Sequence, residues 1–247
     1  MTVIALLADP PRPGLVLPRL AETLSPEVAA DCYEALLRDT VRAVEGSGGD
    51  LLVNYRSDED IPDEHVPADG DAEAELRALV ADELGGTKEV RFERQVGSTE
   101  SARAGNTVTH LLREEEVQTA AVVRGTAPFL GRTVVDNAAM KLRRSAVVLG
   151  PSTRGRTYYA GFGEPVDFAD ALGDDELPTL AGRAADAGVD ADFLPMSPVV
   201  ADEEDLRTVL PMLEARRQAG RVVPTNLAAF VTDHGLRVED GRAVVEK

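Results

Sequence analysis

The sequence has no tryptophan, a single cysteine and only three lysines among its 247 residues. One cysteine excludes a disulfide within the chain. Because Cys32 lies in a helical pattern, we expect it to be a small buried hydrophobe rather than a nucleophile. His65, His110 and His234 each lack a metal-like partner at helical spacing. This scarcity argues against a zinc site and against a histidine-based hydrolase.

Long apolar runs and the common nucleotide or hydrolase motifs are also missing. No apolar run reaches the roughly 18 residues that would span a bilayer. Residues 2–8 are apolar, but they have no basic start and are followed by Asp9 and prolines, so we expect a first strand rather than a signal peptide. GxGxxG, GxxxxGK and G-x-S-x-G motifs are absent. These features favour a soluble, cytoplasmic protein.

The charge is strongly one-sided. Acidic residues number 44 and basic residues 26, giving a net charge of -18. Only three of the basic residues are lysines, so the other 23 are arginines. An acidic, lysine-poor surface stays hydrated in concentrated salt, where charge repulsion is screened, and is typical of halophilic proteins. No basic stripe is present that could neutralise phosphates along a strand, so nucleic acid is not expected as a partner.

Buried strands alternate with amphipathic helices along the chain, which predicts βαβ units and a mostly parallel sheet in a three-layer α/β/α sandwich. The segment 157–162 differs in character and is a candidate antiparallel strand. Strands are predicted at 2–8, 51–55, 88–95, 118–125, 145–150, 157–162 and 192–196. Helices are predicted at 26–45, 72–83, 99–115, 131–144, 177–188 and 202–219.

The last part of the chain does not continue the alternation of strands and helices. A helix is predicted at 224–234, and the Glu-Asp-Gly-Arg centre of 236–245 predicts a β-hairpin. We therefore predict one α/β domain over residues 1–220 and a C-terminal appendage over residues 221–247.

Three predicted loops follow the carboxyl ends of strands, where open α/β sheets bind ligands. They cover residues 9–20, 124–130 and 150–157 and are rich in glycine, proline and arginine. Glycine and proline also serve simply to turn a chain, so each loop alone is equally compatible with an ordinary strand exit.

Several segments together resemble an uncharacterised family of bacterial and archaeal glycosyltransferase-A-like proteins. This family is related to nucleotide-diphospho-sugar transferases and to the guanylyltransferases of deazaflavin-cofactor biosynthesis. The family pattern P-x-P-G-x-V-K-T-R-L is similar to residues 11–20, and V-L-G-P-A-x-D-G-G-Y-Y-L-I-G is similar to residues 148–161. A Q-x-x-G-D-L-G-x-R segment is matched only by Gln95 and Arg103. The resemblance covers about residues 2–213 and implies a glycosyltransferase-A-like (GT-A-like) fold. It also implies that the chain is a haloarchaeal-type member of the family with degenerate motifs.

The chain departs from the family where the family carries acids. Its metal-binding Asp after the fourth strand falls on Thr126, and the Asp of D-G-G falls on Arg154. The acids of the closing D-V-D fall on Val199 and Ala201. The family implies Mg²⁺ or Mn²⁺, but these side chains offer no carboxylate oxygen, which is what magnesium prefers. We therefore expect no catalytic metal at these positions.

Arginines gather in the same loops, and we expect Arg19, Arg124, Arg154 and Arg156 around one edge of the sheet. Guanidinium groups bind phosphate bidentately and are always charged. The partner expected is a nucleotide or another phosphorylated small molecule. The alternative is that these arginines have no ligand and pair with surface acids. The predicted nucleotide- or anion-binding residues are Pro13, Gly14, Arg19, Arg124, Thr126, Ser152, Arg154, Gly155 and Arg156.

Two functions follow from the resemblance and its departures. One is a nucleotide-diphospho-sugar-transferase-like protein that transfers glycosyl or nucleotidyl groups; the other is a non-catalytic anion-binding or regulatory protein on the same fold. An open, arginine-lined cleft would favour ligand binding, and a cleft filled by Phe129, Tyr158 or Tyr159 would oppose it. Guanylyl transfer to a small phosphorylated acid would need a cation site, for which Asp9 and Asp202 are the nearest candidates.

Overall fold

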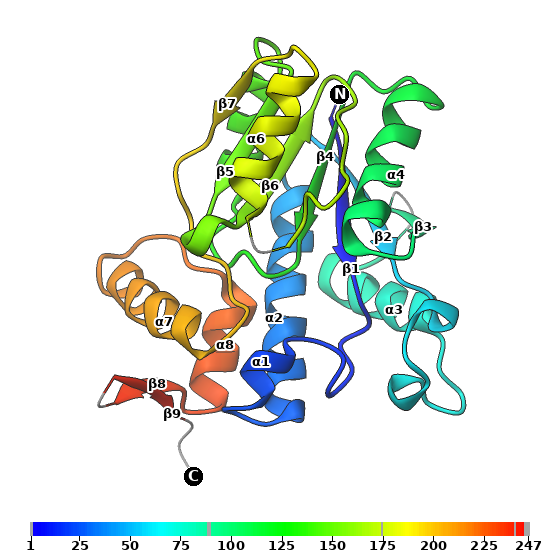
Figure 1. The fold of residues 1–247 in the computed structure, drawn as a ribbon. Helices are drawn as coiled ribbons and strands as arrows, with labels where there is room; N and C mark the ends of the chain where they lie inside the picture. The colour runs from blue at the N-terminus through cyan, green and yellow to red at the C-terminus, as the bar shows by residue number, and fades with distance from the viewer. Residues whose placement is uncertain (1, 88–89, 174, 240, 245–247) are drawn as a thin grey trace.

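The computed structural model describes residues 2–87, 90–173, 175–239 and 241–244. A seven-stranded sheet runs through its centre in the order β3-β2-β1-β4-β6-β5-β7. Only β6 runs antiparallel to its neighbours, β4 and β5. The strands are β1 (Thr2–Ala8), β2 (Asp50–Tyr55), β3 (Arg91–Arg94), β4 (Thr119–Arg124), β5 (Val147–Pro151), β6 (Thr157–Phe162) and β7 (Ala191–Phe193). The fold is the predicted three-layer α/β sandwich (Figure 1).

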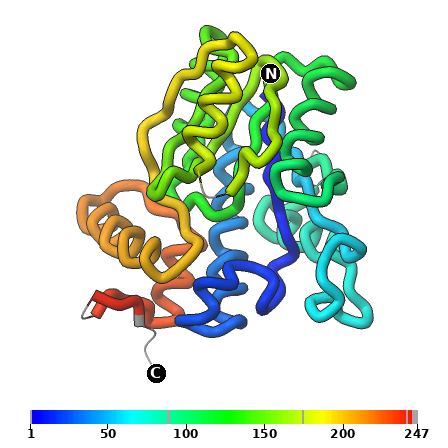
Figure 2. Tube along the Cα trace, viewed as in Figure 1, coloured from blue at the N-terminus to red at the C-terminus, as the bar shows by residue number. Residues whose placement is uncertain are grey.

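Helices cover both faces of this sheet. They are α1 (Pro18–Ala21), α2 (Pro26–Glu45), α3 (Ala72–Leu84), α4 (Glu100–Arg113), α5 (Arg132–Lys141), α6 (Glu176–Asp186), α7 (Glu203–Gln218) and α8 (Thr225–Asp233). Short 3-10 turns lie at η1 (Asp58–Asp60), η2 (Asp63–His65) and η3 (Thr153–Gly155). The small hairpin β8 (Arg237–Glu239) and β9 (Arg242–Val244) lies beside α7 and α8 (Figures 1 and 2).

The central strand β1 divides the core into two halves. All seven of its residues are buried, as expected for a strand covered on both faces. Ile4 and Leu6 belong to the cluster formed with α2, α3, α5, α7 and α8, whereas Ala5 and Leu7 belong to the cluster formed with α4 and α6. Successive side chains point to opposite faces, so one strand anchors both layers.

The long helix α2 shows how local sequence sets the element bounds. Ser25 is its N-cap, and the Ser25 hydroxyl accepts a hydrogen bond from the Val28 N–H; Pro26 occupies the first turn. Cys32 faces the core and is fully buried, as predicted. Burial raises the pKa of this thiol to about 12, so Cys32 stays protonated and behaves as a small hydrophobe.

The predicted elements are found with small shifts in their bounds. The antiparallel direction of 157–162 and the hairpin near the C-terminus are confirmed. Among the described residues of the strand predicted at 88–95, only Arg91–Arg94 form a strand, and α1 begins within the loop predicted at 9–20, where no helix was predicted. Lys88 and Glu89 of that strand, residue 240 of the hairpin and residues 245–247 lie outside the described residues.

The segment that we predicted to be an appendage packs closely on the rest of the chain. Leu227 and Phe230 of α8 belong to the larger core cluster, and α8 lies along α2. The Asp39 carboxylate of α2 accepts hydrogen bonds from the backbone N–H groups of Asn226 (3.0 Å) and Leu227 (2.9 Å). The division at residue 220 stays a prediction. Among the described residues, no helix has the length and apolar character to cross a membrane.

Candidate functional site

A cleft of about 680 Å³ opens at the carboxyl ends of the parallel strands. Asp9 follows β1, Arg56 follows β2, Gln95 follows β3 and Arg124 ends β4, and all four residues line it. This edge is where open α/β sheets place their ligands, because the strand ends and the following loops leave a concave surface there.

The charge of the cleft is opposite to that of the whole chain. Among the described residues, six arginines and three acids line it, whereas the chain as a whole carries -18. The arginines are Arg19, Arg56, Arg103, Arg124, Arg154 and Arg156; the acids are Asp9, Glu100 and Glu176. A local excess of positive charge in a concave site concentrates anions.

The structure brings five of the nine predicted site residues together at this cleft. They are Arg19, Arg124, Thr126, Arg154 and Arg156. Phe129, Tyr158 and Tyr159 do not line the cleft, so these aromatic side chains do not fill it. Their placement leaves the cleft open to a ligand, although no role of the five residues in binding follows from placement alone.

The other four predicted residues shape the loops and are not among the lining residues. Pro13 is exposed, and Gly14 adopts a φ of 79° in a turn against His65, so a side chain there would be strained and crowded. Ser152 is buried and its hydroxyl has no partner among the described residues. Gly155 has a φ of 71° and turns the chain after Arg154.

Arg56 and Arg103 are cleft residues that the site prediction did not include. Arg56 follows the buried strand β2 directly, and this position at the carboxyl end of a parallel strand was a usable signal. Arg103 lies in the second turn of α4 and was noted only as a match to a family segment. Gln95 is also buried at the cleft, where its side-chain amide donates to the Asn54 carbonyl oxygen at 2.7 Å.

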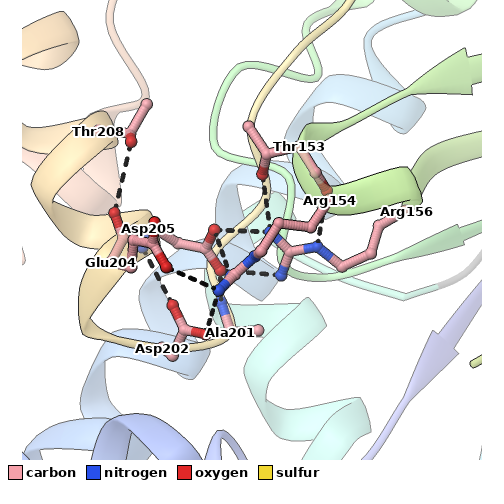
Figure 3. A network of polar contacts seen from close by, with 8 residues as sticks. All are labelled: Thr153, Arg154, Arg156, Ala201, Asp202, Glu204, Asp205 and Thr208. Atoms are coloured by element: carbon pink, nitrogen blue, oxygen red, sulfur yellow. Dashed lines mark hydrogen bonds and ion pairs between the residues drawn. The ribbon is translucent and has the colours of Figure 1, made fainter. Parts of the chain in front are cut away.

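Arg156 is held at one end of the cleft by the buried carboxylate of Asp205. Arg156 donates two hydrogen bonds to Asp205, Nη1 to Oδ2 at 2.9 Å and Nη2 to Oδ1 at 2.6 Å (Figure 3). This paired geometry is the strong, bidentate form of a guanidinium–carboxylate contact. It joins the chain just before β6 to the first turn of α7.

Arg154 joins the same network from a left-handed backbone conformation with a φ of 59°. Its Nη1 lies 2.8 Å from Asp202 Oδ2 and 3.2 Å from Glu204 Oε2, and its Nη2 lies 2.8 Å from Asp205 Oδ1 (Figure 3). Asp202 is also the N-cap of α7 and accepts from the Asp205 N–H. Burial tends to raise the pKa of Asp202, but the hydrogen bonds from Arg154 and the Asp205 N–H and the nearby positive charges outweigh it and lower the pKa.

Arg124 lines the cleft and lies between two carboxylates. Its Nε is 2.6 Å from Glu100 Oε1, and its Nη1 is 2.7 Å from Glu176 Oε1. Glu176 is buried, and its second oxygen accepts from both the N–H and the hydroxyl of Thr157. These hydrogen bonds fix Glu176, and through it they fix the position of Arg124.

Asp9 and Arg56 form an ion pair at the end of β1. Arg56 Nε lies 2.8 Å from Asp9 Oδ1, and the Asp9 N–H donates to the Tyr33 hydroxyl at 3.1 Å. Burial raises the pKa of Asp9, and this effect exceeds the lowering caused by Arg56 and Arg103. The negative charge of Asp9 is therefore less stable in the cleft than in water.

The positions at which the resemblance implies metal-binding acids carry no carboxylate in this chain. Thr126 lines the cleft, and its carbonyl oxygen accepts from the Val200 N–H at 2.8 Å, which places these two loops side by side. Threonine, valine and alanine at 126, 199 and 201 offer no carboxylate. Asp9 and Asp202, the candidates for a cation site, are each paired with an arginine. In the part of the chain that the structure describes, no three His, Cys, Asp or Glu side chains form a group that could hold a metal ion.

Comparison with known proteins supports the fold. No protein-family model matches the chain, and no curated protein sequence matches it. The chain is similar in structure to a provisionally named nucleotide-diphospho-sugar transferase from Desulfovibrio desulfuricans G20, with a TM-score of 0.74 and 20% identity over 94% of this chain and 95% of that one.

Two cytidylyl-group enzymes are more distant matches. A 4-diphosphocytidyl-2C-methyl-D-erythritol synthase from Anaerococcus prevotii has a TM-score of 0.52 and 11% identity over 87% of this chain and 96% of its own. A CMP:2-keto-3-deoxy-manno-octonic acid synthetase complexed with CTP has a TM-score of 0.50 and 12% identity over 87% and 99%. The chain therefore has the fold of nucleotide-diphospho-sugar-transferase-like proteins.

Proposed function

We propose that this protein binds a nucleotide or another phosphorylated small molecule in the arginine-lined cleft and does so without a divalent metal. The observation that carries the proposal is the excess of guanidinium groups over carboxylates at the ligand-binding edge of the sheet, in a chain with a net charge of -18. Arginine suits phosphate because its planar group donates two parallel hydrogen bonds and keeps its charge.

The reaction class that the fold favours is transfer of a glycosyl or nucleotidyl group. A structure of similar fold is described as complexed with CTP, which supports a nucleotide as the ligand. In phosphoryl and nucleotidyl transfer, the site acts largely by placing the reactants and balancing the charge on phosphate oxygens. In this chain, fixed guanidinium groups would balance that charge in place of the carboxylate-held metal that Thr126, Val199 and Ala201 do not support.

Thermal unfolding tests the proposal directly. Nucleoside mono-, di- and triphosphates and nucleotide-sugars should each be added to the protein in EDTA and in Mg²⁺. We expect a rise in Tm with a phosphorylated ligand in EDTA, because a ligand that binds only the folded state stabilises it. The absence of a rise with any of these anions, or a rise that requires Mg²⁺, would refute metal-free binding.

A non-catalytic anion-binding or regulatory protein is the second candidate. It is favoured by the carboxylates that already pair with Arg124, Arg154 and Arg156, since a ligand would have to displace them. The two candidates differ in turnover. Phosphorus NMR of the protein with nucleoside triphosphates and sugar phosphates would show new diphosphate resonances for a transferase and unchanged spectra for a binding protein.

The acidic, lysine-poor composition supports a further proposal, that the protein functions in concentrated salt. Screening should relieve the repulsion among its carboxylates. We expect the free energy of unfolding to rise between about 0.1 M and about 2 M KCl. Over this range the Debye length falls from about 10 Å to a few Å, so repulsion between neighbouring carboxylates is increasingly screened. Urea unfolding at each salt concentration measures it, and a steady fall with salt would contradict the proposal.

A further inference from the structure

A second cavity lies away from the cleft, between α7, α8 and the segment that leads into β8 (Figure 1). Its described lining residues lie within 210–217 of α7, at Val223, within 228–232 of α8 and within 235–238. We call it the C-terminal pocket. Its volume is about 540 Å³, compared with about 680 Å³ for the cleft, and the two cavities have none of their described lining residues in common.

The lining of the C-terminal pocket is mostly apolar. Leu210, Leu213 and Leu236 are buried along it, whereas Val223 and Val231 are half-buried and keep apolar surface uncovered. Of its thirteen described lining residues, nine have no polar atom in their side chain. A cavity of this size, with an apolar lining and a few polar groups, is typical of sites for small organic molecules.

The charge around the C-terminal pocket differs from that of the rest of the chain. Residues 207–247 contain seven basic and five acidic residues, so this segment carries +2, whereas residues 1–206 carry -20. The charged residues among the described lining are Arg217, Arg237 and Glu214, two cations and one anion. In a strongly acidic protein, this local balance favours an anionic ligand over a cationic one.

Arg217 is a cation that a ligand could reach at low cost. It lies in the last turn of α7, and its Nη2 is 2.7 Å from Glu214 Oε2. The two side chains are 62% and 46% exposed, so their ion pair contributes little to stability. An acidic group of a ligand can therefore take the place of Glu214 without leaving a buried charge unpaired.

The size of the C-terminal pocket favours a small molecule over a second copy of the chain. A stable protein–protein interface takes about 20–30 residues from each partner. The thirteen described residues that line this pocket are too few for such an interface, but they are enough to surround a compact ligand.

We propose that the C-terminal pocket binds a small amphiphilic anion, with its apolar body against Val223 and Val231 and its acidic group at Arg217. The ligand class is an aliphatic or aromatic molecule that carries one carboxylate, sulfonate or similar group. The proposal does not depend on the function proposed for the cleft, because the two cavities have separate linings.

Two fluorescent probes that share one apolar body test the proposal. Anilinonaphthalene sulfonate carries a single sulfonate, and phenylnaphthylamine has the same aromatic body without the charge. Fluorescence titration of the wild type should show saturable binding of both probes. The sulfonate probe should bind about two- to fivefold more tightly, which is the effect of one exposed charge pair.

Arg217→Ala should remove this preference and leave the Kd of phenylnaphthylamine unchanged. Arg216→Ala is the matched control, because it removes the same charge from the neighbouring position of α7. The Arg216 guanidinium lies 4.3 Å from the centre of the Phe129 ring and is outside the described lining of the pocket. The preference for the sulfonate probe should therefore persist in this variant.

Two variants of α8 test the apolar part of the site. Ala228→Phe places a large side chain in the pocket and should weaken the binding of both probes about tenfold or more, because less apolar surface remains for them to cover. Val231→Thr keeps the side-chain volume and guards against a variant that fails to fold. Both probes should bind it about threefold more weakly, because a hydroxyl replaces a methyl group in the lining.

The proposal is overturned if neither probe binds the wild type, or if Ala228→Phe and Val231→Thr bind both probes as tightly as the wild type does. A sulfonate preference that persists in Arg217→Ala would also overturn it. Sedimentation velocity should show a monomer; a dimer that Ala228→Phe dissociates would make a second copy the occupant and overturn the proposal. In each case the function proposed for the cleft is unaffected, because nucleotide titrations test it separately.

Discussion

The two ends of the cleft carry different balances of charge. At the α7 end, the guanidinium groups of Arg154 and Arg156 meet three carboxylates, those of Asp202, Glu204 and Asp205. At the β1 end, Arg56 and Arg103 lie near two acids that line the cleft, of which Asp9 is paired with Arg56 and Glu100 with Arg124. Carboxylates outnumber guanidinium groups at one end but not at the other, so arginines that look alike in sequence have different surroundings.

The acids at the two ends also differ in how well their charge is stabilised. Asp202 is partly buried, and its partners nevertheless lower its pKa. Asp9 is also partly buried and has Arg56 beside it, yet its desolvation raises its pKa. The carboxylates at the α7 end are therefore stabilised in their ionised form, whereas the ionised form of Asp9 at the β1 end is less stable than in water.

Removing Asp205 should have the largest effect. Its carboxylate is 4% exposed and accepts from Arg156 and from the Ala201 N–H. Asp205→Ala leaves a largely buried guanidinium without its partner, and the free energy of unfolding should fall by about 3–5 kcal/mol. Urea unfolding measures this loss.

Glu204→Ala is the matched control for that variant. The Glu204 side chain is 73% exposed, and its contact with Arg154 should contribute at most about 0.5 kcal/mol. Equal losses in the two variants would show that the α7 end is not the buried, structural network described above.

Neutralising Asp9 should sharpen the contrast at the other end. Asp9→Asn frees Arg56 from its carboxylate and adds one positive charge to the net charge of the cleft. Pyrophosphate should bind about three- to tenfold more tightly, corresponding to roughly 1 kcal/mol at a partly exposed site. Calorimetric titration checks this, and weaker binding would mean that Asp9 supports the ligand rather than opposing it.

The raised pKa of Asp9 should also make the free energy of unfolding depend on pH. Its folded pKa lies above the unfolded value of about 3.9, so the folded state holds the Asp9 proton more tightly. Its contribution to stability is present below that value and is lost as the pH rises through the folded pKa. The stability of wild type relative to Asp9→Asn should therefore fall as the pH rises above about 4 and level off once the pH has passed the folded pKa of Asp9; a rise with pH would contradict the raised pKa.

Glu100→Gln should have the smallest effect. The Glu100 side chain is 43% exposed and contacts Arg124, so the pair is weak. Arg124 keeps its buried partner Glu176 and gains little freedom. Pyrophosphate affinity should rise about twofold, because the ligand no longer competes with the Glu100 carboxylate for Arg124, an effect of roughly 0.5 kcal/mol. A tenfold rise would show that Arg124 is a main cation for the ligand.

Most of the fold could be predicted from the sequence because its elements carry local signals. The bounds of α2 follow from Ser25, Pro26 and a continuous helical pattern, and β1 follows from a fully apolar run. Helix α1 was missed because it has only four residues and starts after Leu17 in a left-handed conformation. Helix α1 is stabilised by the burial of Leu17 and Leu20, which depends on tertiary contacts and leaves no local signal in the sequence.

The site could be predicted only in part for a similar reason. Arg124 and Arg154 could be predicted because they lie at or just after the carboxyl ends of strands, where the sequence position predicts a place at the cleft. The partners of these arginines could not be found, since Glu176 and Asp205 lie 52 and 51 residues further along the chain. Whether an arginine is paired or available depends on such distant contacts.

Metal-free binding of a phosphorylated ligand is the central claim, and calorimetric titration of a nucleoside diphosphate tests it most directly. The wild-type protein should be titrated in EDTA and again in Mg²⁺. We predict saturable binding in EDTA, with an equal or weaker affinity in Mg²⁺ because the metal reduces the charge that the arginines recognise. No binding in EDTA together with tight binding in Mg²⁺ would contradict the account.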